Sequence, residues 1–234
     1  MLIKPITTFK RYEYKFILSA AQYTAIFKAV KRHTAADAYG NYLVQNIFFD
    51  TDNWSVIRAS IEQPVYKEKL RLRCYGIPDI QSTMFLELKK KFEGIVYKRR
   101  ISLPMQDLKI IAAREITAVN DSQIGRELDF YLKTHPVYER AHISYKREAF
   151  AGENSLRITF DTNIRFRIDS LDYKQPQGGH EILPEELTLM EIKTSAGIPI
   201  WLTQALSKNE IFPTSFSKYG MGYKKYVLPL TKGK

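Results

Sequence analysis

KLRLRCYGIPDIQSTMFLELKKKFEGIVYKRRIS, residues 69–102, contains three runs in which charged and apolar residues alternate. This alternation is typical of β-strands, whose successive side chains point to opposite faces of a sheet. One face then carries nearly all the charge: Lys69, Arg71, Arg73, Glu87, Lys89, Lys91, Lys98 and Arg100. A sheet face this rich in cations indicates a polyanionic ligand.

The same spacing recurs elsewhere in the chain. On further predicted strands it puts these residues on the charged side: Arg11, Glu13, Lys15, Tyr145, Arg147, Arg157, Asp161, Glu191 and Lys193. In an ordinary half-buried antiparallel sheet these charges would face solvent. If the sheet instead closed into a barrel with this face inward, like charges would repel, so the tunnel would need water, counter-ions or an anionic ligand.

Local signals predict an α+β chain that forms a single domain over residues 1–234. Strands are expected at 9–18, 41–51, 65–75, 83–92, 95–103, 137–150, 154–168 and 188–195, with the 161–163 segment interrupting the seventh. Helices are expected at 20–31 after the N-cap Ser19, within 52–60, over 105–133 with a break near 120–122, and at 198–207 and 215–226. Residues 170–186 form a polar Gly/Pro-rich loop, either a lid or a surface connection.

Composition restricts the class of protein. Lys and Arg number 36 against 25 Asp and Glu, a formal charge of +11, which favours phosphate-bearing partners. The single cysteine, Cys74, excludes an internal disulfide and fits a reducing compartment. With no signal-peptide pattern and no apolar run near the ~20 residues of a membrane span, we expect a cytoplasmic protein. The four histidines lack metal-ligand spacing and are expected at the surface or in loops: His33, His135, His142 and His180.

Eight segments, in order, resemble the VTC (vacuolar transporter chaperone) polyphosphate-polymerase domain, a branch of the CYTH or triphosphate tunnel metalloenzyme superfamily. They are RYEYKF (11–16), KLRLRCYG (69–76), FLELKKK (85–91), VYKRRIS (96–102), SYKREAF (144–150), LRITFDTNI (156–164), MEIKTS (190–195) and FSKYGMGYKK (216–225). The resemblance spans nearly the whole chain. It implies a closed antiparallel β-barrel with flanking helices, whose basic tunnel binds a nucleoside triphosphate and a divalent metal ion.

The resemblance also implies roles for individual residues. The expected phosphate ligands are Arg71, Arg73, Lys89, Lys98, Arg147 and Arg157. Further substrate contacts are expected from Lys15, Arg100, Tyr145, Lys193, Ser217 and Lys218. Glu191 corresponds to the carboxylate that holds Mn²⁺ or Mg²⁺; Glu87 is either a second metal ligand or a partner of basic residues across the tunnel. Lys90, Lys91 and Arg99 are expected to be solvated, and Asp161 either lines the tunnel or caps a turn.

The implied function is metal-dependent polymerisation of the γ-phosphate of ATP into inorganic polyphosphate. Tunnel hydrolases begin with Glu-x-Glu-x-Lys, whereas Arg11 replaces the first glutamate here, which favours retention of a phosphate chain over hydrolysis. The alternatives are a tripolyphosphatase or nucleoside triphosphatase of the same fold and a non-catalytic polyphosphate- or nucleic-acid-binding module. No RNP-like run is present, so ATP and polyphosphate are the expected partners and nucleic acid is not. A membrane-protein partner and the oligomeric state stay open.

Overall fold

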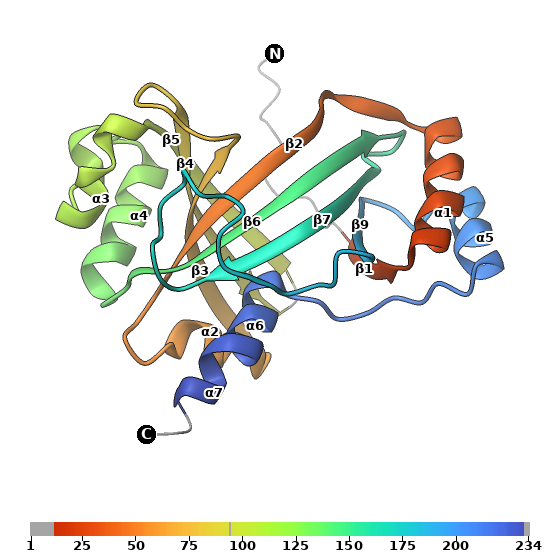
Figure 1. The fold of residues 1–234 in the computed structure, drawn as a ribbon. Coiled ribbons are helices and arrows are strands. Elements are labelled where there is room, and N and C mark those ends of the chain that lie inside the picture. Colours follow the sequence, from red (N-terminus) through yellow and green to blue (C-terminus); the bar gives the residue numbers. More distant parts are fainter. Residues whose placement is uncertain (1–11, 94, 232–234) are drawn as a thin grey trace, which may run out of the picture. The chain divides into compact units, whose positions relative to one another are not determined.

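A computed structural model describes residues 12–93 and 95–231. In these residues nine strands form an antiparallel sheet in the order β1-β9-β7-β6-β2-β3-β4-β5, with the short β8 paired to β7 (Figure 1). The chain packs into two compact units, each discontinuous in sequence. Of the described residues, unit one comprises 12–42, Lys146–Asn163 and Leu183–Phe216, and unit two comprises 43–93, 95–145, Ile164–Ile182 and 217–231. Three strands run from one unit into the other: β2 (Ala35–Asp50), β6 (Tyr138–Ala151) and β7 (Arg157–Arg167).

Unit one combines strand pairs with two helices. Its complete elements are β1 (Tyr12–Leu18), α1 (Ala20–His33), β9 (Thr188–Thr194) and α5 (Ile200–Lys208). The predicted helix start is confirmed, because Ser19 and Gln22 form a capping box at the N-terminus of α1. Apolar residues of the helices and strands meet in one core, which includes Phe16, Ile26, Ile158, Met190 and Leu202.

Unit two contains the strands of the 69–102 stretch. Its elements are α2 (Ser55–Ile61), β3 (Tyr66–Tyr75), β4 (Thr83–Phe92), β5 (Ile95–Pro104), η1 (Met105–Asp107), α3 (Lys109–Ala113), η2 (Ile116–Ala118), α4 (Gln123–Thr134), β8 (His180–Glu181), α6 (Lys218–Gly222), η3 (Tyr223–Val227) and α7 (Leu228–Thr231). Leu70, Leu72, Leu86 and Leu88 are buried in a core with Leu128 of α4. The predicted alternation is therefore confirmed, since one face of β3 and β4 packs under helix and the other carries charge.

Three local expectations are wrong. The predicted interruption at 161–163 lies inside β7, where Asn163 accommodates a φ of 50° without ending the strand. Over 105–133 the predicted break near 120–122 is confirmed, because α4 starts after the N-cap Ser122, but the part before it is not one helix and forms only the short pieces η1, α3 and η2. His142 is buried in β6, where its Nε2 lies 3.0 Å from Oε1 of Gln45, and burial lowers its pKa to about 3.

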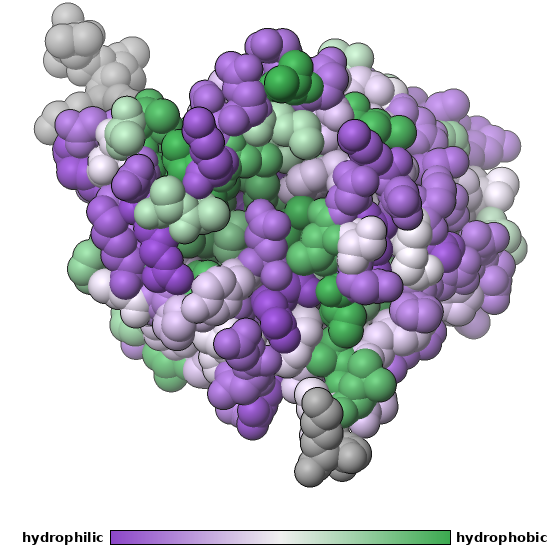
Figure 2. Space-filling model, turned by 60° about the vertical axis from the view of Figure 1, so that its left-hand side comes forward, coloured by the Kyte–Doolittle hydropathy of each residue, from purple (hydrophilic) through white to green (hydrophobic). Residues whose placement is uncertain are grey.

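Two broader expectations are only partly answered. The strand pairings of the described residues do not join β1 to β5, so closure of the sheet into a barrel is not shown. No helix among the described residues is long and apolar enough to cross a membrane. The exterior view in Figure 2 is largely hydrophilic, with smaller apolar patches between the polar side chains.

Candidate anion-binding site

The centre of the charged face in unit two is a buried carboxylate, Glu87 of β4. Strand register places it between Arg71 of β3 and Arg100 of β5. Nε of Arg71 donates to Oε2 at 2.7 Å, and Nε of Arg100 donates to Oε1 at 2.6 Å. Nζ of Lys98 also lies 2.6 Å from Oε1, and Nε of Arg73 lies 4.0 Å from Oε2. Several cations thus share a single carboxylate that is only 1% exposed.

These contacts and the burial of the cluster shift the pKa values of Glu87 and Lys98. Burial alone would raise the pKa of Glu87, but Arg71, Arg73 and Lys98 outweigh it and hold that pKa well below its usual range. Burial lowers the pKa of Lys98 to about 8, against the attraction of Glu87. The carboxylate is therefore ionised at neutral pH, and Arg71, Lys98 and Arg100 bring three positive charges to its one negative charge. A site with this local excess attracts anions.

Asn46 of the neighbouring β2 and Tyr145 of β6 orient Arg73. Its Nε donates to Oδ1 of Asn46 at 2.8 Å, and its Nη2 donates to the hydroxyl of Tyr145 at 3.5 Å. The ammonium of Lys218 lies 4.6 Å from the centre of the Tyr145 ring. Arg73 and Lys218 thus both contact Tyr145, which is buried. Three of the predicted site residues therefore lie together.

Helix α6 places Lys218 through two anchors. Ser217 is its N-cap, and the serine hydroxyl accepts from the backbone N–H of Gly220 at 3.2 Å. The hydroxyl of Tyr219 donates to Oδ2 of Asp50 at 2.7 Å, and its ring stacks on Phe48 with centroids 4.6 Å apart. Neither Asp50 nor Tyr219 was among the predicted site residues, because a buried Tyr–Asp pair separated by 169 positions leaves no periodic signal.

A second group of charged residues lies in unit one. Arg147 forms a two-point contact with Asp161, with Nε and Nη2 donating to the carboxylate oxygens at 2.6 and 2.7 Å. Its Nη2 also lies 3.8 Å from Oε2 of Glu191. Lys193 bridges Glu191 and Glu13 at 3.8 Å from each. Asp161 therefore holds Arg147 in the strand pair, which contradicts the turn-cap alternative.

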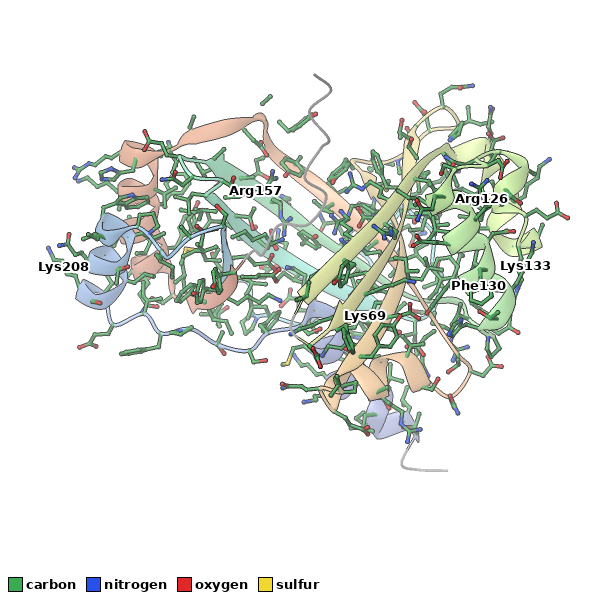
Figure 3. The ribbon with its side chains drawn as sticks, turned by 180° about the vertical axis from the view of Figure 1, so that it is seen from behind. Lys69, Arg126, Phe130, Lys133, Arg157 and Lys208 are labelled. Atoms are coloured by element: carbon green, nitrogen blue, oxygen red, sulfur yellow. The ribbon has the colours of Figure 1, made fainter. Side chains whose placement is uncertain are left out.

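The remaining predicted ligands are placed less centrally. Nζ of Lys15 donates to the carbonyl of Phe216 at 2.7 Å and lies 3.3 Å from Glu13. Lys89 is exposed on β4, opposite Lys69 and Lys98 in the register. Arg157, labelled in Figure 3, is 48% exposed at its side chain and lies 3.4 Å from Asp37 and 3.3 Å from the hydroxyl of Tyr42. Arg11 lies outside the described residues, so the departure from Glu-x-Glu-x-Lys has no structural counterpart here.

Carboxylates suited to a divalent metal ion are few. Among the described residues no group of three or more His, Cys, Asp or Glu side chains could hold a metal ion. Mg²⁺ is commonly bound through one or two carboxylates, with phosphate oxygens and water completing its shell, so Glu191 and Glu13, which share the ammonium of Lys193, are the candidate ligands in unit one. Glu87 fits poorly, because the cations around it already occupy both of its oxygens.

Together the fold and the site define an α+β protein with a basic, anion-binding face on an antiparallel sheet. The VTC domain model matches residues 10–227, and the chain therefore belongs to the VTC-domain family. A search of curated proteins finds no match.

Solved structures share the fold at low sequence identity. A candidate adenylyl cyclase from Hippeastrum, described as having a dominant triphosphatase activity, is 16% identical with a TM-score of 0.53, over 94% of this chain and 99% of that one. A candidate adenylate cyclase from Bacillus halodurans is 13% identical with a TM-score of 0.55, over 95% and 100%. The fold is thus CYTH-like.

Proposed function

We propose that this protein is a metal-dependent phosphoryl transferase that polymerises the γ-phosphate of ATP into inorganic polyphosphate. The observation that carries the proposal is the cluster in which Arg71, Lys98 and Arg100 share the buried Glu87. Membership of the VTC-domain family supports the same substrate class. In this proposal the sheet closes into a tunnel that encloses the charged face.

The basic cluster of unit two holds the triphosphate. Arg71, Arg73 and Arg100 present guanidinium groups, which match phosphate oxygens in two-point contacts, while Lys98 and Lys218 act as point charges. Glu87 is the counter-charge that keeps the cations in place before the substrate binds. Because these groups are positioned by strand register and by Asn46, little reorganisation accompanies the reaction.

Phosphoryl transfer needs positioning and charge stabilisation more than covalent chemistry from the protein. A terminal oxygen of the growing chain attacks the γ-phosphorus and forms a new P–O bond. The bond from this phosphorus to the β–γ bridging oxygen breaks, and ADP leaves with the electron pair. In this proposal Arg147, Arg157, Lys15 and Lys193 also contact phosphate groups, and so does Lys89 of β4.

Glu191 and Glu13 would hold Mn²⁺ or Mg²⁺, which would neutralise charge on the phosphate oxygens. Both are hard cations that prefer oxygen ligands. The loose contacts of Glu191, at 3.8 Å to Arg147 and to Lys193, are compatible with exchange of these partners for a metal ion.

Product analysis tests the proposal. Purified protein is incubated with ATP and Mn²⁺ or Mg²⁺, with and without short polyphosphate primers, and ADP, free phosphate and chain length are measured. We expect one phosphate to be added to polyphosphate for each ADP released. Free phosphate without chains would identify a triphosphatase of this fold, and binding without ADP release would identify a binding module.

A further inference from the structure

The charged face of β3 and β4 continues beyond the Glu87 cluster as two rows of lysines. Strand register pairs Lys69 with Lys89, and Lys89 with Lys98 of β5. The next row toward the β4–β5 turn pairs Lys67 with Lys91. Alternate positions on a strand share a face, so both rows lie on the same side as Arg71 and Glu87.

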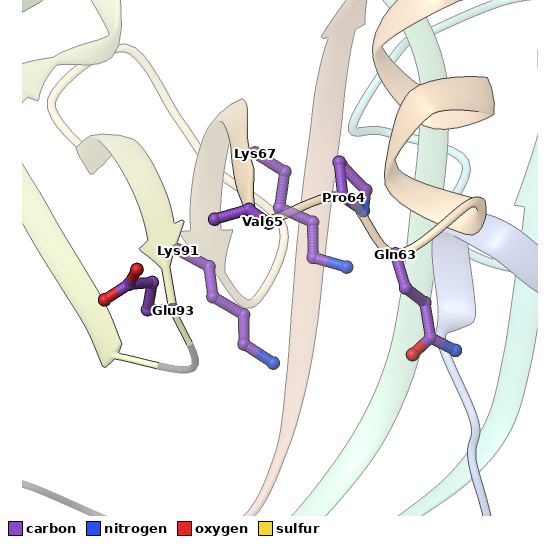
Figure 4. Close-up of a pocket in the computed structure, with 6 residues that line it drawn as sticks. All are labelled: Gln63, Pro64, Val65, Lys67, Lys91 and Glu93. Carbon is purple, nitrogen blue, oxygen red and sulfur yellow. The ribbon is translucent and has the colours of Figure 1, made fainter.

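A pocket of about 290 Å³ lies at the end of these rows. Its lining residues are Gln63, Pro64, Val65, Lys67, Lys91 and Glu93, and Figure 4 shows the lysine side chains extending in the same direction beside Gln63. Nζ of Lys67 donates to the carbonyl of Ser60 at 3.1 Å. Burial, and then the charge of Lys91, lower the pKa of Lys67, so the two ammonium groups repel each other where they meet the pocket. Lys91, expected from sequence to be a solvated charge, is thus half-buried at a concave site.

We propose that the pocket at Lys67 and Lys91 is a subsite for the distal part of a linear condensed phosphate whose other end lies at the Glu87 cluster. This inference rests on the proposed function. Arg71, which lies opposite Glu87, is four residues from Lys67 on β3, and this separation spans about 14 Å at ~3.4 Å per residue. The distance from the Glu87 cluster to the pocket exceeds the length of one triphosphate. The subsite therefore selects inorganic chains longer than the triphosphate of ATP.

The arrangement of aromatic residues favours a phosphate chain over single-stranded nucleic acid. Base binding uses aromatic rings as stacking platforms beside the cations. Here Tyr66 and Phe92 form one row, and Tyr97 pairs with Lys90 in the next, so these rings alternate onto the face opposite Lys67 and Lys91. The lysine rows therefore offer repeated positive charge without stacking surfaces.

Equilibrium binding to the full chain tests this subsite. The ligands are labelled polyphosphate of about 100 phosphates, tripolyphosphate and single-stranded RNA. Each is measured in the absence of ATP and metal ions. The variant is K67Q/K91Q. The control K109Q/R126Q removes the same charge in unit two from exposed residues of α3 and α4, whose helices belong to the core under the opposite face of the sheet (Figure 3 labels Arg126). A charge-preserving variant, K67R/K91R, and thermal melting of all three proteins report on folding.

We expect K67Q/K91Q to weaken long-chain binding about tenfold and to reduce its salt dependence, since contacts from basic side chains dominate such affinity. Tripolyphosphate binding should change less than about twofold, and K67R/K91R should keep long-chain affinity. An unchanged affinity for the long chain, an equal loss for tripolyphosphate, or a matching loss for RNA would each overturn the subsite. Because no turnover is measured, a protein that binds as expected but makes no polyphosphate would refute the polymerase and leave the subsite standing.

Discussion

The charged clusters of the two units differ in balance. In unit two, Arg71, Lys98 and Arg100 surround one buried carboxylate. In unit one, four predicted ligands each meet one or two carboxylates: Arg147 with Asp161, Arg157 with Asp37, Lys15 with Glu13, and Lys193 with Glu13 and Glu191. The first arrangement leaves a local excess of positive charge, and the second is close to neutral.

This difference predicts different roles for the two clusters. A cluster with excess positive charge binds phosphate most strongly, because an added anion relieves repulsion among its cations. A balanced cluster gains less from an anion, but its carboxylates can accept a metal ion.

The largest effect is expected from Arg71→Ala. Removing a preorganised charge that stabilises the transferring phosphoryl group costs on the order of 10² to 10³ in kcat. ADP release and chain formation should fall together in this variant. Arg126→Ala is the control, since the exposed Arg126 of α4 pairs with the exposed Asp121 before this helix, and its activity should match that of the unsubstituted protein. Activity of Arg71→Ala within about threefold of the unsubstituted protein would contradict the assignment.

Replacing Glu87 tests how much this buried carboxylate contributes to the free energy of unfolding. Glu87→Gln leaves Arg71, Lys98 and Arg100 without their counter-charge, and we expect the free energy of unfolding to fall by about 3 kcal/mol in denaturant titrations. Added tripolyphosphate should restore much of this loss by supplying the missing negative charge. The matched change in unit one, Glu191→Gln, should cost less than about 1 kcal/mol and raise the metal concentration needed for activity.

Because the pKa of Glu87 is depressed, the stability difference between the unsubstituted protein and Glu87→Gln should depend on pH. A carboxyl whose folded-state pKa is depressed stabilises the fold above its ordinary pKa of about 4.3, and that contribution is lost as the pH falls below it. The unsubstituted protein should therefore lose stability below about pH 4 more steeply than Glu87→Gln. Parallel pH profiles of the two proteins would argue against a strongly depressed pKa.

The lowered pKa of Lys98 predicts that activity falls at alkaline pH. With its pKa lowered to about 8, it loses its charge as the pH rises through that value, and kcat/KM should fall above it. The decline should reach about tenfold at pH 9 if the charged form alone binds substrate. Lys98→Arg keeps its charge throughout this range, so its profile should stay flat to higher pH. A decline at the same pH in Lys98→Arg would assign it to another group.

The smallest effect is expected from the anchor of α6. Tyr219→Phe removes the hydrogen bond to Asp50 but keeps the ring on Phe48, which should weaken the placement of Lys218 by about 1 kcal/mol. We expect KM for ATP to rise about fivefold with kcat little changed. A fall in kcat at constant KM would indicate that Tyr219 acts on the transition state instead.

Much of the fold follows from local sequence. Alternation in 69–102 predicted β3, β4 and β5 and assigned Leu70 and Leu88 to the core side and Arg71 and Lys89 to the other, because side-chain direction in a strand is a local property. The helix start at Ser19 was predictable for the same reason, since capping needs only neighbouring residues. The expectation for His142 failed because its burial depends on Gln45, which is distant in sequence.

Side-chain alternation along the chain was therefore enough to predict that Arg71, Glu87 and Lys89 share one face of the sheet and that this face is basic. Tertiary structure decided which acid meets which base: that Glu87 is surrounded by cations, that Asp161 holds Arg147, and that Asp50 anchors Tyr219. The physical reason is that side-chain alternation is set by adjacent residues, whereas ion pairing depends on strand register and on contacts between segments far apart in the chain.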